Sequence, residues 1–285
     1  MENHLCGCGA PFSGCSFWTE VGKAAFGGWD EIDPGALREL QRSVDRNRFI
    51  PLMLARGWAP TYRRRLVHYG EHLARLYRAI ADVSGANVIV DSSKHASYAY
   101  LLREVGGIDL RVIHLVRDPR GVAYSWTKEI RKPEVTDRVE FMPRYHPGRM
   151  AFRYLAYNGA FHVLRGLGVP THLVRYEAFV ARPQEHLLAI LRFAGLEATV
   201  RHVDGTTIEL RPTHSVAGNP MRFRQGRLDL RIDDAWRTEM DRRLAMIVGM
   251  LTWPLRCAYG YRQPGRMGGA ARSSSIDDPQ GQEPR

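Results

Sequence analysis

The sequence predicts an α/β fold with a parallel sheet, and one stretch of the chain carries most of this prediction. Residues 87–90 and 110–116 are short apolar runs rich in β-branched side chains, which is typical of fully buried strands. Each run leads directly into polar residues that open a helix, so the order is strand, helix, strand, helix. Because strands joined by a helical crossover lie parallel, we expect a parallel sheet with helices packed against it.

Periodicity and end signals predict the other elements. The first 35 residues are rich in glycine and cysteine and have no regular pattern, while residues 131–147 and 214–226 are typical of loops. A third strand is expected at 171–174. The helices expected outside the strand–helix unit are 37–54, 60–83, 149–167, 183–195 and 234–251.

Length and composition indicate one domain. The 285 residues suit a single α/β domain, which we expect to span residues 1–262, followed by a disordered polar tail at 263–285. A hydrophobic content of 44% and a charged content of 25% are typical of a soluble globular protein. No signal-peptide pattern opens the chain, and the longest apolar run, 244–255, is too short to span a bilayer. We therefore expect a cytoplasmic protein with no integral membrane segment.

The formal net charge of +11 indicates an anionic ligand without selecting one. Phosphorylated or sulfated molecules, nucleic acid and an anionic membrane surface all fit this charge. Arginine predominates among the basic residues, and guanidinium groups suit phosphate-like oxyanions. The arginines are dispersed over helices with no basic strand interleaved with aromatic residues, which argues against a nucleic-acid partner.

Three of the four cysteines, Cys6, Cys8 and Cys15, lie close together near the start of the chain. With His4 they form a set that zinc could use, but the spacing matches no standard zinc site. Free thiols in a reducing compartment are the favoured interpretation, so no metal ligand is assigned. A structural metal stays as the alternative, and the metal content of the purified protein decides between the two.

Polar turns follow the two predicted strands, at the edge of a parallel sheet where ligands bind. Arg117 ends one strand, and Ser125 lies two turns into the following helix. A helix N-terminus stabilises an anionic group, which Arg117 can hold bidentately while Ser125 donates its hydroxyl. Taken alone, the Arg-Asp-Pro sequence also fits a simple helix cap with an exposed arginine.

The other turn contains Ser92, Ser93, Lys94 and His95 and again opens a helix. Lys94 can neutralise a transferring phosphoryl or sulfuryl group, and His95 can act as a general base, because histidine titrates near neutral pH. For His95 alone, a surface or capping histidine fits equally well. Two cationic, hydroxyl-rich turns on one edge of the sheet together predict an anion site.

The motif Arg117-Asp-Pro-Arg-x-Val-x-x-Ser resembles the 3′-phosphate-binding motif of sulfotransferases that use 3′-phosphoadenosine 5′-phosphosulfate (PAPS). Leu173-Val-Arg-Tyr-Glu and the later Pro183 resemble the family's next strand and helix. His214-Ser-Val-Ala-Gly-Asn-Pro-Met-Arg-Phe-Arg resembles the loop that closes over the cofactor in a bacterial branch, which also has a Cys-Gly-Cys-Gly opening like residues 6–18. The resemblance implies a P-loop-NTPase-like, three-layer α/β/α fold with a central parallel sheet.

The resemblance also implies a role for each matching residue. Arg117 and Ser125 would bind the 3′-phosphate, and Tyr176 would lie against the adenine. Lys94 would contact the sulfuryl group, and His95 would be the catalytic base. The implied cofactor-binding set is Arg117, Arg120, Ser125, Ser93, Tyr176, Gly218, Asn219, Arg222 and Arg224, with Lys94 and His95 catalytic and no metal required.

Two of these residues keep an alternative explanation. Tyr176 also fits a core tyrosine at a strand end, and Arg224 also fits a solvated arginine. The acceptor is not encoded in any motif, so a small molecule, a glycan and a lipid all remain open, as does the oligomeric state. The loop at 131–147 and the aromatic N-terminal region are expected to shape the acceptor pocket.

One part of the family pattern is expected before the cysteines and is not found there. It is a first strand that enters a glycine-rich phosphosulfate loop, and residues 7–16 lack both the strand and the helix that such a loop joins. Either the true protein starts earlier, or this is a truncated relative with impaired activity. We favour the earlier start, and the upstream DNA read in frame tests it.

Two other function classes compete with a sulfotransferase. A phosphate-loop kinase would need a Gly-Lys-[Ser/Thr] loop, which the sequence lacks. A nucleotide-binding relative without turnover would keep the same anion site. Preference for ATP with Mg²⁺ would favour the kinase, and binding of adenosine 3′,5′-bisphosphate without transfer would favour the relative.

Overall fold

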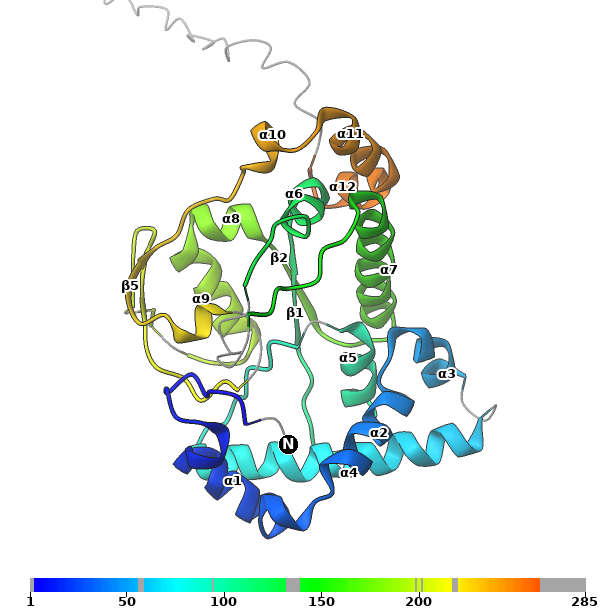
Figure 1. Ribbon diagram of the computed structural model, residues 1–285, viewed down its shortest axis with the longest axis vertical. Helices are drawn as coiled ribbons and strands as arrows, with labels where there is room; N and C mark the ends of the chain where they lie inside the picture. Colours follow the sequence, from blue (N-terminus) through cyan, green and yellow to red (C-terminus); the bar gives the residue numbers. More distant parts are fainter. Residues whose placement is uncertain are drawn as a thin grey trace, which may run out of the picture.

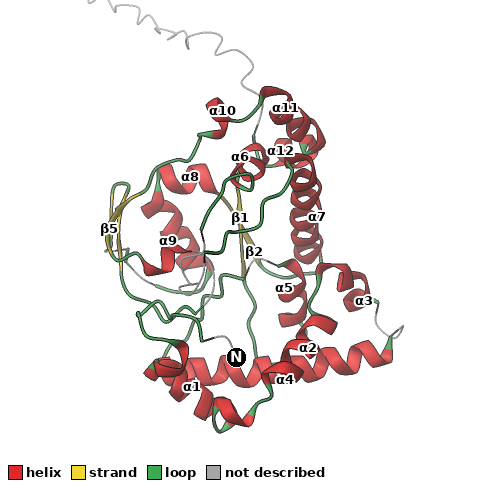
Figure 2. Cartoon of the chain, viewed as in Figure 1, coloured by secondary structure: helices red, strands yellow, loops and turns green. Residues whose placement is uncertain are grey.

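The computed structural model describes residues 3–55, 59–93, 95–131, 139–197, 199–200, 202–216 and 220–261. Its centre is a parallel pair of strands surrounded by helices (Figures 1 and 2). Strand β1 (Val112–Val116) pairs with β2 (Thr171–Arg175), and Val116 lies opposite Arg175. The predicted α/β class and a parallel sheet are confirmed, but the parallel pair is β1 with β2 and not the two strands expected at 87–90 and 110–116.

Helix α7 (Pro147–Gly166) covers one face of β1. Val112 shares a buried cluster with Leu164, and Val116 shares another with Tyr154. On the neighbouring strand, His172 stacks on Phe193 of α9 (Pro183–Phe193) with 5.4 Å between ring centroids. Figure 1 shows α7 on one side of the strand pair and α9 on the other.

The largest core cluster joins α7 to α4 (Pro60–Ser84) and α5 (Ala96–Leu102). None of the helices described has both the length and the apolar character needed to cross a membrane. The other helices are α1 (Ser16–Phe26), α2 (Pro34–Val44), α3 (Ile50–Leu54), α6 (Pro119–Ser125), α8 (Tyr176–Ala181), α10 (Trp236–Glu239), α11 (Arg242–Leu251) and α12 (Trp253–Ala258). The prediction that the first 35 residues have no regular element, with no helix after residues 7–16, is wrong, because α1 forms there and its Phe26 ring contacts His72 of α4. Short 3₁₀ helices are η1 (Phe12–Gly14), η2 (Trp29–Glu31), η3 (Asn47–Phe49) and η4 (Pro220–Phe223).

A small antiparallel sheet was not expected from the sequence. Its strands are β3 (Val203–Asp204), β4 (Thr207–Leu210) and β5 (Gly226–Asp229), in that order. The strands are short and polar, so they show little of the apolar alternation that identifies a half-buried strand. Strand β5 begins at Gly226, the last residue of the segment predicted as a loop at 214–226, and continues beyond it.

Residues 87–90 were expected to form the first strand, and this prediction is wrong. The segment is irregular, has no pairing partner among the described residues, and leaves the Val90 side chain 88% exposed. A strand is stable only when a neighbour satisfies its backbone groups, and apolar composition does not supply that neighbour.

The prediction that 110–116 is buried on both faces is also wrong. Val112, His114 and Val116 are buried, whereas Ile113 and Leu115 are 40% and 58% exposed. The buried face is the one on which α7 packs. The run of apolar residues therefore conceals the alternation of a strand with one covered face.

Two predicted helices are interrupted. The helix expected at 37–54 ends at Val44, and after η3 the chain starts α3 with Pro51 in its first turn, where proline favours a new helix start. The helix expected at 234–251 breaks before Asp241, whose carboxylate accepts a hydrogen bond from the Leu244 N–H and caps α11.

The helices expected at 60–83, 149–167 and 183–195 and the strand expected at 171–174 are confirmed as α4, α7, α9 and β2. Within the loop expected at 131–147, residues 132–138 lie outside the described residues, as does the tail expected at 263–285. The described remainder of the loop has no helix before α7 and one isolated bridge, between Arg131 and Phe141.

His114 in β1 is a buried histidine that packs away from the strand end. Its Nε2–H donates to Asn158 Oδ1 over 2.8 Å, and the Asn158 amide nitrogen donates to the Tyr154 carbonyl, which fixes the orientation of the amide. Burial lowers the pKa of His114, and the hydrogen bond to Asn158 only partly offsets this. The folded protein therefore holds a neutral imidazole here.

This neutral imidazole predicts a pH effect on stability. Unfolded histidine gains a proton below about pH 6.5, whereas folded His114 resists it, so the free energy of unfolding should fall as the pH drops below that value. Each unit of pKa difference corresponds to about 1.4 kcal/mol. Urea titrations between pH 7.5 and 5 should show a shallower loss for His114→Asn than for wild type or for the exposed control His68→Asn. Equal slopes in all three would contradict the prediction.

Candidate active site at the strand ends

The register of β1 and β2 brings two residues together at one edge of the sheet. Arg117 follows Val116 and Tyr176 follows Arg175, and Val116 and Arg175 are direct neighbours. The Arg117 guanidinium lies over the Tyr176 ring, 4.9 Å from its centroid. This cation–π contact orients a guanidinium group that is 20% exposed.

A carboxylate behind this pair holds the strand ends in place. Glu177 accepts a hydrogen bond from the Asp118 backbone N–H at 3.1 Å and from the Tyr261 hydroxyl at 2.5 Å. The Tyr261 hydroxyl also lies 3.2 Å from the Val116 carbonyl. Burial and the Glu177 carboxylate raise the pKa of Tyr261, so its hydroxyl stays protonated and donates. Glu177 belongs to the Leu173-Val-Arg-Tyr-Glu motif, but its anchoring role and that of Tyr261 were not predicted, because their contacts join distant parts of the chain.

Arg117 already binds an anionic group of the protein itself. Its Nη2 lies 3.0 Å from the Asp233 carboxylate and donates to the Asp233 carbonyl. The Asp233 N–H donates to the Tyr176 hydroxyl at 3.2 Å, and Lys128 lies 4.0 Å from the carboxylate. Burial alone would raise the pKa of Asp233, but the hydrogen bond and charge of Arg117, with the charge of Lys128, lower it overall. This edge of the sheet therefore stabilises a negative charge.

Arg120 pairs with Asp118 and not with Asp233. Its Nε and Nη2 form a bidentate pair with Asp118 at 2.9 and 2.6 Å, and its guanidinium lies 4.3 Å from the Trp236 ring centroid. The Asp118 carboxylate also accepts from the Arg120 backbone N–H and so caps α6. Arg256 is buried nearby, and burial and then the charge of Arg120 lower its pKa. Arg120 and Arg256 thus add positive charge beneath the site.

Gly121 lets these groups approach one another. A Cβ atom at this position would lie 3.0 Å from Trp236 and 3.1 Å from the Arg117 Nε. Any side chain here would displace the arginine or the tryptophan. Ser125, at the end of the same helix, donates its hydroxyl to the Val122 carbonyl at 2.7 Å, so it must rotate to donate to a ligand.

The turn at 91–95 is anchored to other helices. Asp91 accepts from the Ser93 N–H at 2.7 Å and from the Tyr77 hydroxyl of α4 at 2.5 Å. His95 is exposed at the start of α5, and its ring centroid lies 6.1 Å from that of Tyr157 on α7. Lys94 lies outside the described residues.

Tyr157, whose ring lies near His95, is hydrogen-bonded to a cation of the same helix, Arg153. Arg153 donates to the Tyr157 hydroxyl at 3.1 Å and also lies over the Tyr145 ring. Sequence reasoning missed this pair, although its i, i+4 spacing places both residues on one helix face.

The predicted closing loop is described only in part. Arg222 belongs to η4, with its guanidinium 4.4 Å from the Phe223 ring centroid, and Arg224 is exposed beyond it. Gly218 and Asn219 lie outside the described residues. Of the residues expected to bind cofactor, the structure thus brings Arg117 and Tyr176 into contact, with Arg120 and Ser125 on the adjoining helix. Ser93 and His95 belong to the separate turn before α5.

The family model described as the sulfotransferase family matches residues 34–200, which is more than half of the chain. The chain belongs to the sulfotransferase family. No curated protein and no solved structure matches it. The matched region of this sulfotransferase includes the turn after β1, the segment before α5 and the Glu177 anchor, and the family implies a P-loop-like α/β fold. Because residues 87–90 form no strand, the prediction that both turns follow strands is wrong for the segment before α5. The cysteine-rich segment and η4 lie outside the match.

The Tyr261 anchor predicts a measurable loss of stability. Tyr261→Phe removes the donor to Glu177 and leaves that carboxylate short of a partner, so the free energy of unfolding should fall by about 1.5–3 kcal/mol. Tyr100→Phe is the matched control, because it removes one hydroxyl that donates to the Ala160 carbonyl away from the strand ends. We expect about 1 kcal/mol from the control. Urea denaturation measures both, and an equal loss in the two variants would argue against the anchor.

Proposed function

We propose that this sulfotransferase transfers a sulfuryl group from PAPS to an acceptor hydroxyl or amine and leaves adenosine 3′,5′-bisphosphate. The observation that carries the proposal is the Arg117–Tyr176 pair at the joined strand ends, inside the family match. Sulfotransfer in general follows from the family, whereas the donor and the acceptor class are our inference.

Charge and contacts support a 3′-phosphate clamp at Arg117. Its guanidinium already holds the Asp233 carboxylate, so the same donors suit a phosphate oxygen. Lys128 is close enough to contribute charge to the same anion. Ser125 would rotate its hydroxyl toward the phosphate, and Tyr176 would offer an aromatic edge to the adenine. Arg120, paired with Asp118, would contribute its charge rather than a direct contact.

The chemical step is assigned to the other turn. His95 would remove the proton from the acceptor while the acceptor atom forms a bond to sulfur. The bond from sulfur to the bridging oxygen then breaks, and its electron pair leaves on the 5′-phosphate. Lys94 is assigned from the sequence alone to neutralise this leaving charge, as cations do in phosphoryl transfer.

Several features support His95 as the base. The side chain is exposed, so an acceptor can reach it, and it starts a helix that α4 and α7 hold in place. Arg153, bound to Tyr157 beside it, is a cation that can attract an anionic sulfuryl group. Ser93 in the same turn is an exposed hydroxyl donor, and Arg222 and Arg224 are proposed, with Gly218 and Asn219, to close over the nucleotide.

Arg117→Ala tests the clamp. Removing a charge-assisted donor from a phosphate should cost about 2–3 kcal/mol, roughly 30- to 150-fold in the dissociation constant for adenosine 3′,5′-bisphosphate. Isothermal titration calorimetry of the full chain measures this. Arg111→Ala is the matched control, because Arg111 precedes the strand that Arg117 follows and should leave affinity unchanged. Equal affinities in wild type and Arg117→Ala would refute the clamp, and stronger binding of ATP with Mg²⁺ would favour a kinase.

His95→Ala separates binding from chemistry. Affinity for adenosine 3′,5′-bisphosphate should stay within about twofold, while transfer of labelled sulfate from PAPS into acceptors of a cell extract should fall about 10²- to 10⁴-fold. His202→Ala, an exposed histidine next to β3, should leave both unchanged. Wild-type protein that binds the nucleotide but transfers nothing would support a relative without turnover. Undiminished transfer by His95→Ala would show that His95 is not the catalytic base.

A further inference from the structure

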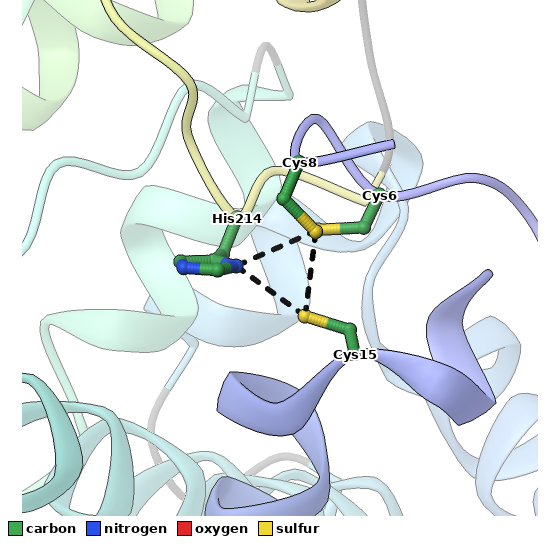
Figure 3. Close-up of side chains that lie close together, drawn as sticks. All are labelled: Cys6, Cys8, Cys15 and His214. Carbon is green, nitrogen blue, oxygen red and sulfur yellow. Dashed lines mark hydrogen bonds between the residues drawn. The ribbon is translucent and has the colours of Figure 1, made fainter. Parts of the chain in front are cut away.

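Four side chains from two distant segments converge outside the proposed active site. Cys6, Cys8 and Cys15 come from the N-terminal segment, and His214 comes from the loop that leads to η4 (Figure 3). Their sulfur and nitrogen atoms all lie within 4.8 Å of one another. The His214 Nδ1 is 3.3 Å from the Cys15 sulfur and 3.9 Å from the Cys6 sulfur, and the sulfurs of Cys8 and Cys15 are 3.7 Å apart.

These separations match the edges of a tetrahedron around one zinc ion. With Zn–S near 2.3 Å and Zn–N near 2.05 Å, tetrahedral ligands lie about 3.8 Å apart for two sulfurs and about 3.6 Å apart for sulfur and nitrogen. A disulfide would need the sulfurs at about 2.05 Å, and all four cysteines of the chain are free. The close spacing suits a single ion and leaves no room for an iron–sulfur cluster.

The backbone around the cysteines is shaped to bring them together. The Cys6 N–H donates to the Ala10 carbonyl and the Gly9 N–H to the Cys6 carbonyl, each over 2.8 Å, which closes a tight turn. Gly9 has a φ of +92°, a conformation that favours glycine. A Cβ atom on Gly7 would lie 2.5 Å from the Thr213 carbonyl. Both glycines of Cys-Gly-Cys-Gly therefore have a steric role in this turn.

Contacts with Phe17 and Trp18 hold His214 in an orientation that directs its ring toward the cysteines. The His214 ring stacks on Phe17 with 4.8 Å between centroids, and the Trp18 indole N–H donates to the His214 carbonyl at 2.7 Å. The Gly7 N–H donates to the Ser215 carbonyl at 2.8 Å, so the two segments are also joined directly. Supporting contacts of this kind orient ligands at metal sites.

We propose that the sulfurs of Cys6, Cys8 and Cys15 and the Nδ1 of His214 bind a structural zinc ion. Three thiolates and one imidazole complete a four-coordinate shell with no open position, which is the pattern of structural rather than catalytic zinc. The sequence spacing groups His4 with the cysteines, whereas the structure places His214 among them. The ion would link segments 199 residues apart and anchor the base of the loop that carries Arg222. This inference does not depend on the identity of the sulfuryl donor.

Metal content of the purified, reduced full-length chain tests the site. We expect about one zinc ion per chain by mass spectrometry. Replacement with Co²⁺ should give the absorption of a tetrahedral thiolate complex. A zinc-supplied wild type that holds no more metal than Cys15→Ser would overturn the proposal, and so would an iron chromophore.

Variants assign the ligands. Cys15→Ser and His214→Ala should weaken Co²⁺ binding more than about 100-fold, while the controls Cys257→Ser and His4→Ala should keep it. His214→Cys should still bind Co²⁺, with an absorption spectrum shifted by the fourth sulfur ligand. This variant tests the role of position 214 even if His214→Ala fails to fold. Circular dichroism checks folding. Loss of metal in His4→Ala but not in His214→Ala would contradict the assignment.

Discussion

The Glu177 carboxylate is the contact on which the arrangement of the strand ends depends. It accepts the Asp118 backbone N–H after β1 and the Tyr261 hydroxyl, while Glu177 itself follows β2 by two residues. One side chain thus fixes both strand ends relative to each other and to the end of the last helix. The position of Arg117 over the Tyr176 ring follows from this geometry. Because the carboxylate is partly buried, the loss of its hydrogen-bond donors would lower the stability of the fold.

Basic side chains near this anchor are paired with acidic groups of the protein. Arg256 lies near Arg120, and two arginines here are each paired with an acidic group of the protein: Arg117 with Asp233 and Arg120 with Asp118. Asp118 is buried in a bidentate pair and caps α6, so it belongs to the scaffold. Asp233 is more exposed than Asp118 and contacts the Arg117 guanidinium directly. A bound phosphate would therefore compete with Asp233 and not with Asp118.

Local patterns in the sequence were sufficient for much of the fold, and long-range contacts were not. The apolar stripe of α4 and the β-branched runs of β1 and β2 identify these elements directly. Residues 87–90 are rich in β-branched side chains like β1, yet within the described part of the chain no strand pairs with them, and sequence alone does not reveal this. At the site, Arg117 and Tyr176 follow from a motif. The anchoring role of Tyr261, and the contact of His214 with the cysteines away from this site, do not follow from a motif, since each residue contacts residues more than 80 positions away.

The long-range contact of Tyr261 affects the order in which parts of the fold form during synthesis. The Tyr261 hydroxyl reaches back 145 residues to the carbonyl that precedes Arg117. During synthesis the strand pair and α8 leave the ribosome well before α12 does, since chains elongate from the N-terminus at about 5–20 residues per second. For several seconds the nascent chain therefore presents Arg117 without its final support. The contacts that hold Arg117 and Glu177 are complete only when α12, the last described helix, has been made and Tyr261 has docked, so this edge of the sheet is among the last parts of the described fold to form.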